Sequence, residues 1–146
     1  MKRIFMKKAC FSVFCMLLTF GMALSAQAED GTIEIDVAPN VLNIQSEGKV
    51  VTVHTDIPFS QVGYENVKLE VTLNGIPIKS YKSDARGYFV AKFSMLDVEE
   101  KFYSGYFELG PNILVLKGLE STGEEFLGSQ VITIINVLPS GSGKVV

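Results

Sequence analysis

The sequence predicts an all-β domain made of two packed antiparallel sheets. From Thr32 onward, short segments rich in alternating apolar and polar residues recur at intervals of about 8–15 residues, and this period is typical of strands with one buried face. Glycine, proline, asparagine and aspartate separate the segments, as turns between strands require. Strands do not alternate with long helical segments, which argues against the parallel sheet of an α/β fold.

The first 28 residues have the order of a secretory signal peptide. The basic residues of this segment all lie at its start: Lys2, Arg3, Lys7 and Lys8. An apolar run follows from Ala9 to Leu24, and the segment ends Ala26-Gln27-Ala28. A charged start, an apolar centre and small residues of the form A-x-A mark a cleavage site. We therefore expect recognition of Ala26 and Ala28, cleavage after Ala28, and export to the periplasm or the extracellular space.

Removal of residues 1–28 changes what the 146-residue chain implies. It leaves 118 residues, which we expect to form one domain over 29–138 and a flexible tail rich in glycine and serine over 139–146. Four basic residues and no acidic ones leave with the segment, so the formal net charge moves from −3 to −7. Both cysteines, Cys10 and Cys15, leave as well. The domain then has no disulfide and no thiolate metal ligand, and it depends on its hydrophobic core.

The remaining charge and hydropathy also limit the partners. Nine basic residues are scattered among 16 acidic ones, so no cluster is present to replace the counterions of nucleic acid or to bind an anionic membrane surface. After the signal segment there is no apolar stretch near the roughly 20 residues that a spanning helix needs. We expect neither a nucleic-acid partner nor a membrane span.

Four strands are expected in the first half of the domain. Apolar residues alternate over 33–37, and the pattern resumes over 41–44 after a break at Ala38-Pro39-Asn40. Residues 50–55 are rich in β-branched side chains, and residues 67–73 alternate until Asn74-Gly75 turns the chain. A turn at 46–49 and a loop at 56–66 connect these strands.

The second half continues the pattern, with one exception. Residues 76–82 lead to a turn at 83–87, and Phe89, Ala91 and Phe93 share one face of the next strand. Met95, Val98 and Phe102 have the spacing of a helix over 95–102. An aromatic loop over 103–111 precedes two near-continuous apolar strands, 113–117 and 131–135, which a turn at 120–124 joins. About seven strands at this spacing favour an Ig-like Greek-key sandwich, although the Cys and Trp signature of antibody domains is absent.

Two stretches at the ends of the domain share a pattern with known modules. Ile35-Asp36-Val37-Ala38-Pro39-Asn40-Val41-Leu42-Asn43-Ile44 precedes the strand at 50–55, and Thr122-Gly123-Glu124-Glu125-Phe126-Leu127-Gly128-Ser129 precedes the last strand. They resemble the opening and the closing hairpin of short Ig-like modules in exported bacterial proteins. The match covers most of 33–137 and departs at Thr122 and Gln130, where aspartate is usual. The resemblance implies the fold and the compartment; such modules have no assigned chemistry.

A more local likeness lies in the middle of the chain. Val71-Thr72-Leu73-Asn74-Gly75-Ile76-Pro77-Ile78, followed by Ser83-Asp84-Ala85-Arg86-Gly87-Tyr88-Phe89, is similar to carboxypeptidase-regulatory-like and prealbumin-like sandwiches. Some related modules carry an acidic run that holds calcium at the second position. Only Asp84 stands there in this chain, so the resemblance implies no calcium site.

The sequence offers little for catalysis. His54 is the only histidine, and it lies within a strand with no aspartate or nucleophile at a motif spacing. Ser46-Glu47-Gly48-Lys49 matches S-x-x-K, which acts at a helix start in much larger enzymes. Gly141-Ser142-Gly143-Lys144 is half a phosphate loop without the strand and helix around it. The acidic pairs Glu99-Glu100 and Glu124-Glu125 could act as the acid and base of a glycosidase only if both carboxylates reached the same substrate bond. Adjacent residues point apart in a strand or a turn, so neither pair is expected to do so. We expect a non-enzymatic protein without cofactor or metal.

Four aromatic residues within six positions are the most unusual feature: Phe102, Tyr103, Tyr106 and Phe107. One interpretation is a platform for a sugar ring or for a partner's apolar side chain, because tyrosine has a flat apolar face and a polar tip. The other is that the phenylalanines cap the sandwich while the tyrosines lie on its rim. Phe59 and Tyr64, in the loop at 56–66, form a second candidate.

These observations favour an exported binding or structural module. We expect it to contact another exported or cell-surface protein, with the aromatic loop as anchor and an exposed sheet edge as a place for a partner strand. The alternative is a module that binds polysaccharide through Tyr103 and Tyr106.

Overall fold

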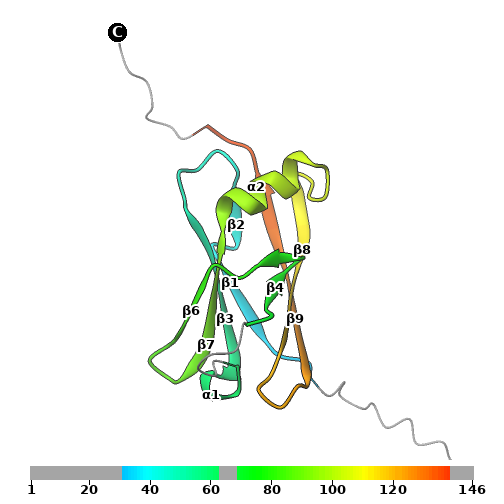
Figure 1. The fold of residues 1–146 in the computed structure, drawn as a ribbon. Helices are drawn as coiled ribbons and strands as arrows, with labels where there is room; N and C mark the ends of the chain where they lie inside the picture. Colours follow the sequence, from blue (N-terminus) through cyan, green and yellow to red (C-terminus); the bar gives the residue numbers. More distant parts are fainter. Residues whose placement is uncertain (1–30, 63–68, 139–146) are drawn as a thin grey trace, which may run out of the picture.

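The structure is a computed structural model that describes residues 31–62 and 69–138. Its strands form two sheets that face each other, as predicted (Figure 1). One sheet has four strands in the order β1 (Ile35–Ala38), β3 (Val50–Pro58), β7 (Tyr88–Ser94) and β6 (Ser80–Ser83). The other has five strands in the order β2 (Val41–Asn43), β9 (Glu125–Ile135), β8 (Gly110–Leu119), β4 (Thr72–Leu73) and β5 (Ile76–Pro77). Ala26, Ala28, Tyr64 and the tail at 139–146 lie outside the described residues.

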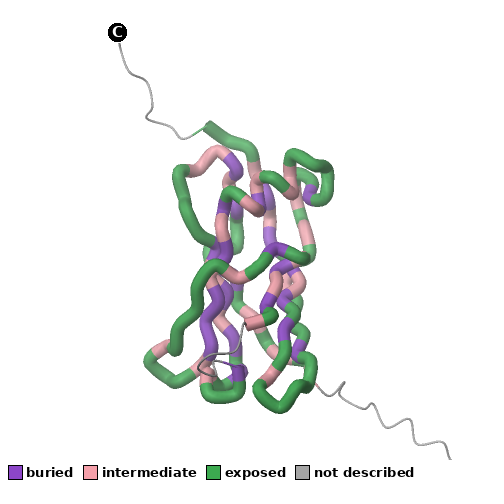
Figure 2. Tube along the Cα trace, viewed as in Figure 1, coloured by how far each residue is buried: buried purple, intermediate pink, exposed green. Residues whose placement is uncertain are grey.

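The core fills the space between the sheets (Figure 2). Phe89, Ala91 and Phe93 lie on one face of β7 and are fully buried, which confirms the face predicted for them. The opposing sheet contributes Leu114, Leu116, Phe126, Ile132 and Ile134. Because each strand alternates between its two faces, burial of one face removes its apolar side chains from water and leaves the other face outside.

The N-terminal segment pairs with both sheets in turn. The N–H of Ile33 donates to the carbonyl of Leu127 at 2.9 Å, β1 then pairs with β3 in the other sheet, and β2 returns to pair with β9. The β2–β9 pair is parallel, whereas the other pairs of named strands in the described part are antiparallel. A purely antiparallel sandwich was therefore the wrong prediction, because one edge is closed by a segment that changes sheets.

Two helices close the ends of the sandwich (Figure 1). Helix α2 (Met95–Tyr103) joins β7 to β8 and buries Met95 and Val98, which confirms the predicted helix. Helix α1 (Phe59–Val62) lies where a loop was predicted, because β3 continues to Pro58 and Val62 packs into the core. Within 31–62 and 69–138, neither helix is long and apolar enough to cross a membrane.

Strand lengths differ from the sequence-based prediction in three places. Only Thr72–Leu73 of the expected strand at 67–73 is paired in the described residues. In contrast, β8 and β9 exceed the predicted 113–117 and 131–135 and form a hairpin with ten paired positions. The described part holds nine strands instead of about seven. One reason is that the segment at 76–82 is divided between β5 in one sheet and β6 in the other.

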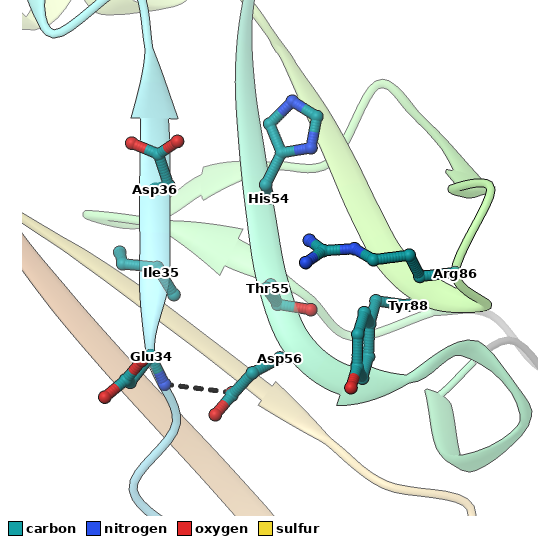
Figure 3. A pocket seen from close by; sticks show the side chains of 8 residues that line it. All are labelled: Glu34, Ile35, Asp36, His54, Thr55, Asp56, Arg86 and Tyr88. Atoms are coloured by element: carbon teal, nitrogen blue, oxygen red, sulfur yellow. Dashed lines mark hydrogen bonds between the residues drawn. The ribbon is translucent and has the colours of Figure 1, made fainter.

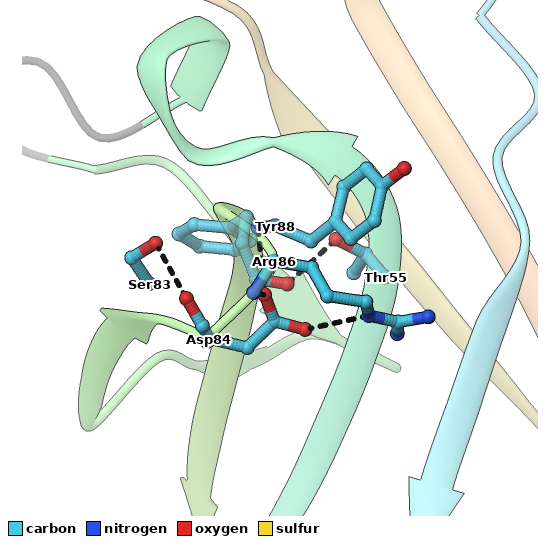
Figure 4. Close-up of polar contacts among 6 residues, drawn as sticks. Thr55, Ser83, Asp84, Arg86 and Tyr88 are labelled. Atoms are coloured by element: carbon cyan, nitrogen blue, oxygen red, sulfur yellow. Dashed lines mark hydrogen bonds and ion pairs between the residues drawn. The ribbon is translucent and has the colours of Figure 1, made fainter.

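Asp84 holds the turn between β6 and β7 (Figure 4). Its Oδ1 accepts the N–H of Arg86 at 2.8 Å and the N–H of Tyr88 at 2.9 Å, and its Oδ2 lies 3.6 Å from Arg86 Nε. The N–H of Tyr88, supported by the N–H and the guanidinium of Arg86, lowers the pKa of the Asp84 carboxyl. This carboxylate therefore binds donors of its own turn.

Gln130 ties the N-terminal segment to β9. Its side-chain oxygen accepts the N–H of Val37 at 2.6 Å, across 93 residues of sequence. Gln130 is one of the two positions at which the chain departs from the modules it resembles. The bond satisfies a backbone donor of edge strand β1 that has β3 on one side only.

We predict that Asp84→Asn lowers stability at neutral pH but not in strong acid. A carboxyl with a lowered pKa stabilises the fold above its ordinary value of 3.8, and this stabilisation is lost as the pH falls through the lowered folded value. Asparagine keeps the oxygen acceptor without the charge. Thermal unfolding of both proteins from neutral to acidic pH should show two curves that converge. A gap that persists unchanged in acid would contradict the assignment.

We predict that Gln130→Ala lowers the free energy of unfolding by about 1 kcal/mol, because the N–H of Val37 loses its acceptor. Gln130→Glu keeps an oxygen at the same reach and should unfold close to the wild type at neutral pH. Urea unfolding of the three proteins provides the comparison. Equal destabilisation by both substitutions would show that the side-chain amide has another role.

Candidate binding surfaces

The aromatic end, which we define as Phe102, Tyr103, Tyr106 and Phe107, lies at the last turn of α2 and in the loop after it. The two phenylalanines face inward: Phe107 is buried and Phe102 packs against the core. The two tyrosines face outward, with 67% of Tyr103 and 56% of Tyr106 exposed. The phenylalanines thus help close this end of the sandwich, and only the tyrosines are available to a partner.

A helix C-cap fixes the position of Tyr106. Gly105 has a φ of 82°, in the left-handed region that glycine tolerates. The N–H of Gly105 donates to the carbonyl of Phe102 at 3.0 Å, and the N–H of Tyr106 donates to that of Lys101 at 2.9 Å. These two bonds define a Schellman motif. The order Lys-Phe-Tyr-Ser-Gly-Tyr therefore ends α2 and places Tyr106 beside the helix.

Neighbouring side chains hold both tyrosine rings. The Tyr103 ring meets the Phe102 ring edge to face at 5.5 Å, and the Tyr106 ring meets the Phe107 ring in the same way at 5.0 Å. Lys101 Nζ lies 4.4 Å from the centroid of the Tyr106 ring, within the range of a cation–π contact. One face of Tyr106 is therefore occupied, and a ligand can stack only on the other.

Phe59, from the second predicted candidate, does not join the aromatic end. It belongs to α1, at the opposite end of the sandwich from α2 (Figure 1). Its ring stacks on Phe89 at 6.3 Å and lies 6.1 Å from Tyr81. Phe59 therefore packs against the core and the edge strand β6. Its predicted companion Tyr64 is outside the described residues.

His54 lines a shallow hollow of about 400 Å³ on the outer face of the four-stranded sheet (Figure 3). Asp36 stands directly opposite His54 on β1, and the same hollow is lined by Glu34, Asp56, Arg86 and Tyr88. This grouping was not predicted from the sequence, because only the β1–β3 register brings Glu34, Asp36, His54 and Asp56 together. Arg86 lies over the Tyr88 ring at 5.2 Å and pairs with Asp84.

Two hydroxyl-bearing residues line the hollow, Thr55 and Tyr88, and the hydroxyl of Thr55 is taken up by a backbone carbonyl. Thr55 is the hydroxyl beside His54 in sequence, but it is buried and its Oγ1 donates to the carbonyl of Phe89 at 2.6 Å. Across the part of the chain that the structure describes, no three histidine, cysteine, aspartate or glutamate side chains are arranged to hold a metal ion. What the hollow presents is a polar, solvent-exposed surface.

The outer face of the five-stranded sheet carries exposed apolar residues that were not predicted as a candidate site. Ile113 on β8 and Val131 on β9 stand opposite each other, and each is 60% exposed. The sequence held a signal for this face, since both strands are apolar at consecutive positions. A strand with one wet face is expected to be polar at every second residue.

Comparison of the chain with protein-family models, with curated proteins and with solved structures found no match. The likeness to exported Ig-like modules therefore depends on the sequence stretches quoted for it.

Proposed function

We propose that the chain is an exported, non-enzymatic domain of Ig-like topology that binds another exported or cell-surface protein. The strand order supports the topology: β1-β3-β7-β6 corresponds to strands A, B, E and D, and β9-β8-β4-β5 corresponds to G, F, C and C′. The signal-like segment at 1–28 supports export.

The observation that carries the binding proposal is the pair of exposed, immobilised tyrosines. Tyr103 and Tyr106 are more than half exposed, yet each ring packs against a phenylalanine and Tyr106 is also fixed by the helix cap. Ordering such side chains on binding costs little conformational entropy, and tyrosine is enriched among the residues that dominate interface energies. A protein partner with an apolar side chain fits this surface.

The edge of the four-stranded sheet offers a second contact. All four residues of β6, Ser80–Ser83, are exposed, and among residues 31–62 and 69–138 this strand pairs on one side only, with β7. Its free edge can accept a strand from a partner, which adds backbone hydrogen bonds to the side-chain anchors.

Polysaccharide binding is the alternative function. The free face of the Tyr106 ring and the exposed Tyr103 are the surfaces on which a sugar would stack. A protein partner is favoured because Lys101 covers one face of Tyr106 and because the chain has no tryptophan.

We predict that the double substitution Tyr103→Ala with Tyr106→Ala weakens binding of the natural protein partner at least about tenfold, as expected when anchor residues are truncated. The partner is first identified by capture from the periplasmic and culture fractions, and binding is then measured by calorimetry. Leu96→Ala is the matched control, since Leu96 is an exposed apolar residue of the same helix.

The same variants separate the alternatives. Retention of the wild type on polysaccharide, lost in the double variant, would establish the sugar function instead. Unchanged partner binding in the double variant would exclude the aromatic end as the anchor. An enzymatic activity that His54→Ala abolishes while circular dichroism shows an intact fold would overturn the non-enzymatic assignment.

A further inference from the structure

The two outer faces of the sandwich differ sharply in chemistry. On the four-stranded sheet, the outward positions include Asp36, His54, Asp56 and Lys92. On the five-stranded sheet, the outward positions of β2, β8 and β9 include a group of apolar residues. We call this group the apolar face; its members are Val41, Pro111, Ile113, Val115, Leu127 and Val131.

The strand register gathers these apolar residues on one face, with Thr133 and Ser129 between them. Val41 stands opposite Thr133, which stands opposite Pro111 in the next strand. Two residues further along β8, Ile113 stands opposite Val131, and two residues beyond that Val115 stands opposite Ser129. Directly opposed residues of paired strands share a face and touch through their side chains. The group therefore forms one patch across three strands and not a scatter of single exposed residues.

Nothing in the fold explains why these outward positions are apolar. The inner faces of β8 and β9 already supply Leu114, Leu116, Phe126, Ile132 and Ile134 to the core. Exposure of Ile113 and Val131 at 60% each, with Val41 at 45% and Leu127 at 44%, adds nothing to that core. A contiguous exposed apolar patch rimmed by polar residues is typical of an interaction surface.

Charge indicates which partner covers the patch. Lys117 and Glu125 are the only ionisable residues at outward positions of β2, β4, β5, β8 and β9, and they pair with each other at 3.3 Å. The chain from Glu29 onward carries a formal charge of −7, so two copies repel each other through most orientations. Two copies avoid this like-charge repulsion when the neutral face of one copy contacts the neutral face of the other. A cationic partner would instead be drawn to Glu34, Asp36 and Asp56 on the other sheet.

We propose that the apolar face is a self-association surface, on which two copies of this chain pack with their five-stranded sheets face to face. A two-fold axis makes such a contact self-complementary, and it allows Lys117 of one copy to approach Glu125 of the other. The outward residues of the three strands are fewer than the roughly 20–30 residues per side of a standard interface. The dimer is therefore weak and depends on concentration.

The test is sedimentation of the exported, purified chain from about micromolar to about millimolar concentration. The wild type should shift from monomer to dimer. Val131→Glu should weaken the dimer at least about tenfold, because the two-fold contact brings two new carboxylates together. Leu96→Glu is the matched control, since Leu96 is an exposed apolar residue of α2, outside both sheets, and it should leave the dimer intact. A wild type that stays monomeric throughout, or equal weakening by both variants, would overturn the proposal.

A second measurement decides the matter if Val131→Glu fails to fold. Ser129→Cys places a thiol within the apolar face, and Ser80→Cys places one on the exposed edge strand β6. Mild oxidation should link two copies through position 129 and not through position 80, with peptide mapping to assign the disulfide. Absent or equal cross-linking would overturn the proposal. The Tyr103→Ala, Tyr106→Ala variant should dimerise normally, so this result is independent of the proposed function.

Discussion

Close approach of the strands to the core aromatics is the constraint on which the rest of the sandwich depends. Phe126 lies beneath Gly118 on the paired strand, and a Cβ added to Gly118 would stand only 2.4 Å from the Phe126 ring. Phe126 is fully buried in the same core as Phe89 and Phe93 of the opposing sheet. A side chain at 118 would force this core apart, since protein cores have few voids that absorb an added group.

A second close approach sets where the N-terminal segment runs. A Cβ on Gly128 would lie 2.5 Å from Ile35 Cγ2 and 3.0 Å from the Ile33 carbonyl, so the missing side chain lets this segment cross over β9. Gln130, two residues on, then receives the N–H of Val37. Together, Gly128 and Gln130 let one segment pair with both sheets and close one edge of a domain that has no disulfide in the residues described.

The sequence predicted elements wherever local pattern determines structure. Alternation over 50–55 and the spacing of Met95 and Val98 led to the correct strand and helix. Prediction failed where contacts between residues far apart in the sequence determine the local structure. Phe59 reads as part of a loop until Phe89 and Tyr81 supply a surface for its ring, and Glu34, Asp36 and His54 meet only through the β1–β3 register. The aromatic end was visible because its residues are adjacent in sequence.

The same reasoning explains why the apolar face was harder to see than the aromatic end. A strand such as Ile113-Leu114-Val115-Leu116 can be buried on both faces or carry a binding surface on one, and the sequence is the same in either case. The register resolves the ambiguity, since Leu114 and Leu116 face the core while Ile113 and Val131 face outward with nothing described above them. We therefore propose that the domain uses two surfaces for different contacts. In this proposal Tyr103 and Tyr106 anchor a protein partner, whereas the apolar face, beside the neutral pair of Lys117 and Glu125, contacts a second copy of the chain.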